Sequence, residues 1–502
     1  MSIPFRRHRR NLDTSQVVEL DDWSYWRRPD RVAPVARVKT AEKRVIEPMP
    51  PRLGYFRADG GRAAVGFAPT VYRGTSAQVA GAFPWITPRS LPAIGVPIGQ
   101  DVHTRNAFSC HLAEWTWRKI TTNPNAIFTG IPGSGKSALL KAMIFRFAAF
   151  GVLSLVLGDI KGEYNLLARF LGVEPPVLGP GSRHRLNPLD GGPLAVALPS
   201  DHEERLWRLN AVHGRRITLL STLVQYRLGR PVASIEELAF GRALRRTEAF
   251  DQDRGGAVRD PLIAEVLAEL WALDDEDAEA LHVVGGAAEL RRQIHDAGSA
   301  LATLLDGPLA GLFDGPSTYT VDFSKPIQTV DIHMVEGMGE GPTALALACL
   351  SSWGQAAIDD PARRDDELRL VVRDEVWRQM RYPSLVEKLD ADLRLSRATG
   401  TMQVLATHRF ADFEAAANPV IAKQLVSSCA TKVFLAQDVG PLAVVGDHVG
   451  LTDEEKAQIG SWVDVAVGKA LWRVGNGRGF VVQGSLSALE RRLFHTDNRM
   501  GS

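Results

Sequence analysis

A glycine-rich run between an apolar segment and a helix-forming segment constrains this chain more than any other feature. The run is Gly130-Ile131-Pro132-Gly133-Ser134-Gly135-Lys136-Ser137, and it follows Ala126-Ile127-Phe128-Thr129. Residues 138–144 then show the apolar spacing of a helix. The order of strand, glycine-rich loop and helix separates a phosphate-binding P-loop from an ordinary turn. Inward backbone N–H groups and the helix N-terminus would surround a triphosphate, so the sequence predicts a nucleotide site.

Each residue type in this loop has an expected role. Lys136 would contact the β- and γ-phosphates, and the Ser137 hydroxyl would hold Mg²⁺. The predicted contacts to ATP in this loop are Gly130, Pro132, Gly133, Ser134, Gly135, Lys136 and Ser137.

Composition is that of an ordinary globular protein. The 502 residues are 45% hydrophobic and 23% charged, and the net charge of +1 gives no overall field that attracts nucleic acid. The three cysteines are far apart and lack metal-ligand spacing, which indicates buried thiols in a reducing compartment. No signal peptide or transmembrane segment is expected, because the apolar stretch 142–158 fits the P-loop helix and a following strand. We expect a cytoplasmic protein, and attachment at the cytoplasmic membrane through partners is left open.

The pattern along the chain predicts an α/β fold with a mostly parallel sheet. Expected strands are 153–157, 329–334, 368–373, 402–406, 433–435, 469–474 and 479–482. Expected helices include 206–226, 261–273, 344–358, 384–396 and 487–493.

Five regions follow from this pattern. Residues 1–62 form an arm rich in proline and tryptophan, with 14 basic and 8 acidic side chains, either loosely ordered or a docking segment. Residues 63–120 would be a small N-terminal domain. The P-loop core would comprise 121–200 and 306–502, interrupted by an all-helical insertion at 201–305.

Two adjacent acids follow a later apolar strand and complete a hydrolytic site. Asp374 would reach the Mg²⁺ shell, and Glu375 would act as general base toward the attacking water. Arg373 is unusual, because such strands are normally apolar up to the acid.

Other polar residues are expected where neighbouring strands end, since ligands of parallel sheets bind there. Asp159 and Glu163 follow the second strand and are predicted nucleotide contacts. Thr407 and His408 end a later strand, and either could sense the γ-phosphate, unless His408 is structural. Arg394 or Arg397 could act on a neighbouring subunit as an arginine finger.

The order of these motifs resembles that of the cytoplasmic ATPases of conjugation and type IV secretion, the TraC kind within the HerA/FtsK superfamily. The resemblance covers roughly residues 95–495 and is carried by the P-loop and by runs 159–164, 185–190, 373–377 and 397–408. It implies a RecA-like core that works as a hexamer, uses ATP and Mg²⁺, and has inner-membrane secretion or conjugation components as partners. By position it implies Lys136 and Ser137 as phosphate and Mg²⁺ contacts, Asp374 as the Mg²⁺-water ligand, Glu375 as base, and Arg394 or Arg397 as the finger.

The chain departs from this family in two places. His408 stands where the family usually has Gln, and the N-terminal region is short for the family. Two rival functions also stay open: a DNA-translocating ATPase or coupling protein of the HerA/FtsK type, and a nucleotide-gated scaffold that barely hydrolyses ATP. DNA stays an open partner.

Overall fold

The computed structural model describes residues 91–494 except 197, 249–259, 323, 360–366, 381–382, 410–418, 441, 443–445, 447–448, 464–466 and 478. The basic arm at 1–62 and residues 63–90 of the expected small domain lie outside the described residues. Within the described part, no helix combines the length and apolar character needed to cross a lipid bilayer.

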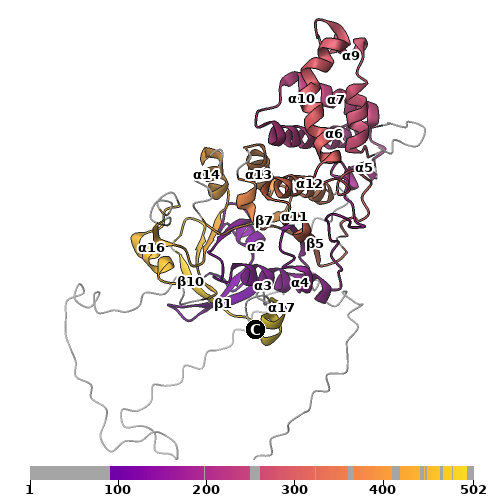
Figure 1. The fold of residues 1–502 in the computed structure, drawn as a ribbon. Coiled ribbons are helices and arrows are strands. Elements are labelled where there is room, and N and C mark those ends of the chain that lie inside the picture. Colours follow the sequence, from indigo (N-terminus) through magenta and orange to yellow (C-terminus); the bar gives the residue numbers. More distant parts are fainter. Residues whose placement is uncertain are drawn as a thin grey trace, which may run out of the picture. The chain divides into compact units, whose positions relative to one another are not determined.

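One ten-stranded sheet forms the centre of the described structure (Figure 1), with the order β2-β1-β10-β9-β8-β3-β7-β6-β4-β5. Strands β8, β3, β7, β6, β4 and β5 pair in parallel, and the others pair antiparallel. Their bounds are Val96–Asp101 for β1, Ala107–Cys110 for β2, Asn125–Thr129 for β3, Leu153–Asp159 for β4, Ile327–Asp331 for β5, Arg369–Arg373 for β6, Thr401–Thr407 for β7, Thr431–Phe434 for β8, Lys469–Val474 for β9 and Phe480–Gly484 for β10.

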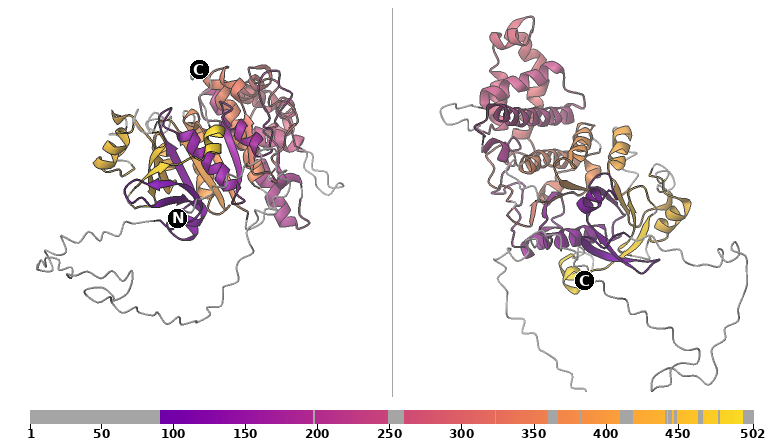
Figure 2. Two further views of the ribbon diagram at one scale, coloured as in Figure 1. Left: turned by 90° about the horizontal axis from the view of Figure 1, so that it is seen from below. Right: turned by 180° about the vertical axis from the view of Figure 1, so that it is seen from behind.

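Helices cover both faces of the parallel strands (Figure 2). Alternate strand residues therefore enter different cores: Phe128 packs with α3 on one face, while Ile127 packs with α13 and α14 on the other. Burial on both faces explains why β3, β5, β6 and β7 are buried at every position. Bounds outside the insertion are Leu112–Trp117 for α2, Lys136–Ala148 for α3, Asn165–Phe170 for α4, Pro193–Val196 for α5, His333–Glu336 for α11, Glu340–Ile358 for α12, Pro383–Leu395 for α13, Pro419–Ser427 for α14, Asp453–Gly460 for α16, Ala488–Phe494 for α17 and Val376–Arg378 for the 3₁₀ turn η2.

After α4 and α5, the described segment between β4 and β5 continues with five helices that pack on one another (Figure 1). They are His202–Leu228 (α6), Ser234–Thr247 (α7), Ile263–Trp271 (α8), Asp275–Ala280 (α9) and Gly286–Asp306 (α10). The side chain of Asp201 caps α6 at its start, and Gly229, with φ +66°, ends it in the left-handed conformation. Their apolar faces share a core with α12, which joins the helical region to the sheet.

The predicted α/β fold with a mostly parallel sheet is confirmed. One strand was predicted too long: 329–334 is strand only to Asp331, and α11 begins at His333. The Asp331 carboxylate accepts a hydrogen bond from the His333 backbone N–H at 2.9 Å, so the chain turns into a helix where the hydrophobic pattern alone suggests strand.

Two strands from the expected small N-terminal domain belong to this same sheet. β1 pairs with β10, and β2 pairs with β1. The division into five regions stays a prediction.

The register of the parallel strands determines which residues meet at their carboxyl ends. Thr129 of β3 lies opposite Thr407 of β7, and Arg373 of β6 lies opposite both Leu405 and Leu157. The segments that follow these strands therefore emerge at one edge of the sheet, which we call the carboxyl edge.

Candidate active site at the carboxyl edge

The P-loop lies between β3 and α3 as the sequence predicts. Gly133 (φ +81°) and Gly135 (φ +96°) adopt left-handed conformations that favour glycine. A Cβ on Gly130 would lie 2.5 Å from Ser134 Oγ, so only glycine fits this close approach. The Ile131 N–H donates to the Ala436 carbonyl at 3.0 Å, which fixes the loop to the segment after β8.

The loop fits a phosphate group. No side chain caps the N-terminus of α3, so no side chain competes with a phosphate for the N–H groups of its first turn. Ser134 Oγ is buried without a hydrogen-bond partner among the described residues. Pro132 and Gly133 are exposed, and Ser137 is half-buried in the first turn of α3. These features leave donors available to a triphosphate.

Lys136 joins the P-loop to the acidic pair after β6. Its Nζ lies 2.9 Å from Asp374 Oδ1, and both side chains are buried. Burial acts to lower the pKa of Lys136, but the charges of Asp374 and Glu375 outweigh it and raise that pKa. The lysine therefore stays cationic beside the carboxylates.

Glu375 is held by three neighbours. Its carboxylate lies 2.8 Å from His408 Nε2 and 3.4 Å from Lys161 Nζ, and it accepts a hydrogen bond from Trp377 Nε1 at 2.6 Å. Burial opposes ionisation, but His408 and Lys136 outweigh it, so the pKa of Glu375 lies well below its ordinary value. The backbone of Glu375 has φ +51°, a left-handed conformation that a non-glycine residue adopts at a cost of about 1–3 kcal/mol.

The turn after β4 brings a second set of charges to the carboxyl edge. Asp159 is buried and accepts hydrogen bonds from the backbone N–H groups of Glu163 (2.7 Å) and Tyr164 (3.1 Å). Burial, opposed by these two bonds, raises the pKa of Asp159 to about 7. Glu163 faces Lys141 of α3 across 3.7 Å. Their roles as nucleotide contacts stay predictions.

Tyr164 contacts the acidic pair directly. Its hydroxyl donates to Asp374 Oδ2 at 2.9 Å, while the other carboxylate oxygen faces Lys136. Burial and the Asp374 charge raise the pKa of Tyr164 well above its ordinary value, so the phenol keeps the proton that it donates. Tyr164 therefore fixes the orientation of Asp374.

We expect Tyr164→Phe to lower the free energy of unfolding by about 1–3 kcal/mol, because it leaves a buried carboxylate oxygen without its donor. Urea unfolding measures this loss, and steady-state assays should show a lower kcat for ATP. Tyr319→Phe is the matched control, since its hydroxyl donates to Gln328 instead. A fall in kcat of the same size in both variants would contradict a positioning role for Tyr164.

The positive charge of Arg373 is balanced by a carboxylate within the fold. It is buried at the end of β6, where its guanidinium donates to Gln403 of β7 and pairs with Asp392 of α13 at 2.8 Å. Burial, partly offset by Asp392, lowers the pKa of Arg373. An arginine before the acidic pair is compatible with the core because α13 supplies its counter-charge.

The two candidate arginine fingers lie away from the P-loop of their own chain. Arg394 is exposed on α13 and pairs with Asp390 at 2.6 Å. Arg397 is exposed in the turn before β7, and thus at the end of the parallel strands opposite the carboxyl edge. A role on a neighbouring subunit stays a prediction for both.

Sequence reasoning gave no role to Lys141, Tyr164 or Trp377. Tyr164 and Trp377 stand within recognised motifs, but their hydrogen bonds to the acids depend on tertiary structure. Lys141 lies within an apolar run of α3 and is 1% exposed, and burial, partly offset by Glu163, lowers its pKa. A lysine in an otherwise apolar helix is the signal that could have revealed it.

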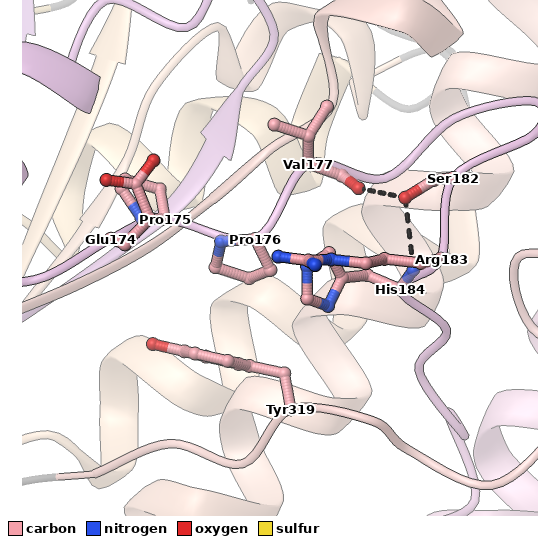
Figure 3. Close-up of a pocket in the computed structure, with 8 residues that line it drawn as sticks. All are labelled: Glu174, Pro175, Pro176, Val177, Ser182, Arg183, His184 and Tyr319. Carbon is pink, nitrogen blue, oxygen red and sulfur yellow. Dashed lines mark hydrogen bonds between the residues drawn. The ribbon is translucent and has the colours of Figure 1, made fainter.

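A hollow of about 380 Å³ lies beside β5, away from the P-loop (Figure 3). Two hydrogen bonds shape its wall: Ser182 Oγ donates to the Val177 carbonyl and accepts from the His184 N–H. Tyr319 lies on the other side of the hollow (Figure 3). None of the sequence-predicted site residues lines it, so it is separate from the P-loop site.

Comparison with solved structures shows where this architecture is found. The solved structure of VirB4 of Thermoanaerobacter pseudethanolicus matches with a TM-score of 0.59 at 18% identity, over 79% of this chain and 97% of the solved chain. The chain has the fold of VirB4. The plasmid coupling protein TrwB, in complex with a GTP analogue, matches with a TM-score of 0.51 at 13% identity, over 74% of this chain and 87% of TrwB. TrwB with an ATP analogue gives 0.50 at 14% identity, over the same shares.

These matches confirm the predicted fold, a RecA-like P-loop core. No family model matches the sequence, and no curated protein matches it. The likeness to VirB4 is therefore one of structure, and it covers nearly all of the solved VirB4 chain.

Proposed function

We propose that this chain is a P-loop ATPase that supplies energy to a conjugative or type IV secretion apparatus. The observation that carries the proposal is the 2.9 Å contact between Lys136 Nζ and Asp374 Oδ1. It joins the predicted phosphate-binding lysine to the predicted acidic pair at one edge of one sheet. The fold shared with VirB4 supports the secretion setting.

The side chains suit hydrolysis of a triphosphate. The P-loop N–H groups would bind the phosphate oxygens. Lys136 carries three donor hydrogens, so it can bond to Asp374 and to a phosphate oxygen together. A Glu375 carboxylate oxygen would accept a proton from a water molecule. The oxygen of that water would attack the γ-phosphorus, and the bond from the γ-phosphorus to the β-phosphate oxygen would break, which releases ADP. The low pKa of Glu375 keeps that carboxylate ionised.

A magnesium ion fits this donor set. Ser137 and Asp374 would hold Mg²⁺, which would neutralise charge on the phosphates. Hard oxygen donors of this kind are those that Mg²⁺ prefers, and it usually takes one or two protein ligands with phosphates and waters. The described residues offer no separate cluster of three or more His, Cys, Asp or Glu for a metal ion.

Action as a hexamer with a finger from Arg394 or Arg397 is part of the proposal. Neither arginine lies at the carboxyl edge of its own chain, which supports action in a neighbouring subunit. Inner-membrane components of a secretion apparatus are the proposed partners.

The second candidate function is DNA translocation or coupling. The fold shared with the plasmid coupling protein TrwB supports it. Stimulation of ATP turnover by DNA would favour this candidate over the first.

The proposal is tested by measuring ATP turnover of the purified full chain with and without DNA, alongside its native mass. We expect Mg²⁺-dependent hydrolysis that DNA does not stimulate, by a protein whose mass corresponds to a hexamer. Nucleotide binding without turnover would contradict the ATPase proposal and favour a nucleotide-gated scaffold.

A further inference from the structure

A small hollow lies at the end of the parallel strands opposite the P-loop. It measures about 300 Å³ and is lined by Ala113, Thr116, Trp117, Lys119, Pro124, Arg397 and Gly400. These residues come from α2 and the turn after it, the segment before β3, and the turn before β7. The seven residues of β7 would separate it from the carboxyl edge by roughly 20 Å, so it is distinct from the ATP site.

The charged residues of this hollow are both cations. Lys119 and Arg397 have no ion-pair partner among the described residues, and no acidic residue belongs to the lining. Two acids on the adjoining helices form ion pairs with other arginines: Glu114 pairs with Arg118, and Asp390 pairs with Arg394. Two free cations that share one hollow favour an anionic ligand.

Trp117 supplies an aromatic surface beside these cations. Its side chain is 55% exposed, whereas three other residues of α2, Leu112, Ala113 and Trp115, are buried. The ring of the buried His111 lies 6.5 Å from it, which supports the indole from the protein side. An exposed tryptophan next to unpaired cations suits a ligand that carries both a planar ring and a phosphate.

We propose that this hollow binds one nucleotide of a single-stranded nucleic acid, with the base against Trp117 and the phosphate between Lys119 and Arg397. A duplex hides its base faces by stacking, so it offers this tryptophan nothing to stack on. The proposal goes beyond the proposed function, since ATP hydrolysis does not require such a site.

The test is fluorescence anisotropy of labelled oligo(dT) with the full chain, without ATP, over a series of salt concentrations. Trp117→Ala should weaken binding by about fivefold or more and leave the salt dependence unchanged. Lys119→Gln and Arg397→Gln should each reduce the slope of log K against log salt by about 0.7, because each loses one phosphate contact.

Matched controls separate binding at this site from non-specific electrostatic binding of the oligonucleotide. The basic arm could contribute to such binding, and every variant retains it. Arg118→Gln removes a charge one residue away from Lys119, but that arginine pairs with Glu114 and lies outside the lining. Trp207→Ala removes another exposed tryptophan, from α6. Both should bind like wild type. Trp117→Phe keeps an aromatic ring and should retain most of the affinity for oligo(dT). Its binding would show that position 117 tolerates substitution, so weak binding by Trp117→Ala would reflect the lost ring and not misfolding.

Equal binding by wild type, Trp117→Ala and Lys119→Gln would overturn the proposal, as would an Arg118→Gln effect equal to that of Lys119→Gln. Tighter binding of duplex than of oligo(dT), or occupation by free ATP alone, would also overturn it. Glu375→Gln should bind oligo(dT) like wild type although it should not hydrolyse ATP, so the result is independent of whether the chain hydrolyses ATP.

Discussion

Glu375→Gln is expected to reduce kcat for ATP by at least about 10²-fold while the protein still binds the nucleotide. The amide keeps the size of the side chain and its position between His408 and Trp377. It cannot accept a proton from the attacking water, so the chemical step alone should fail. Phosphate release measures turnover, and equilibrium binding of a fluorescent ATP analogue measures affinity.

The control for this variant is Glu237→Gln, which changes an exposed glutamate on α7 and should leave turnover intact. Because the pKa of Glu375 is depressed, its carboxylate stays ionised as pH falls from 8 to about 5, and its protonation should not limit kcat there. Turnover of Glu375→Gln at the wild-type rate would exclude Glu375 as the base.

Lys136→Ala is expected to lose both turnover and stability. Without the ammonium group, the phosphates lose a cation that would stabilise the transition state, and kcat/KM should fall by at least about 10²-fold. The Asp374 carboxylate would remain buried without its cation, which should lower the free energy of unfolding by about 3–5 kcal/mol. Phosphate release and urea unfolding measure the two losses.

A double variant separates the two effects of Lys136. Lys136→Ala with Asp374→Asn removes the unpaired charge and should recover part of the stability, but none of the turnover. Recovery of turnover in the double variant would mean that Lys136 acts only through Asp374 and does not contact the phosphates.

Much of this site could be predicted from the sequence because its parts are local. The P-loop depends on glycines and a lysine within eight residues, and the acidic pair follows a strand whose centre is apolar. Parallel pairing then brings segments after different strands to one edge, as the Lys136–Asp374 contact illustrates.

The remaining features depend on tertiary contacts that carry no local signal. Arg373 is acceptable in a buried strand only because Asp392 of α13 approaches it. β5 ends at Asp331, whose carboxylate accepts a hydrogen bond from the backbone N–H of His333 at the start of α11. The free cations beside Trp117 come from segments nearly 280 residues apart in the chain, so no sequence motif contains them.

The most direct test of the central claim is an experimental structure of Glu375→Gln with ATP and Mg²⁺. We predict a γ-phosphate within hydrogen-bonding distance of Lys136 Nζ, with the side chain at position 375 facing the same phosphate from the β6 side. ATP bound elsewhere, or bound at the P-loop with residues 374 and 375 directed away from it, would contradict the account.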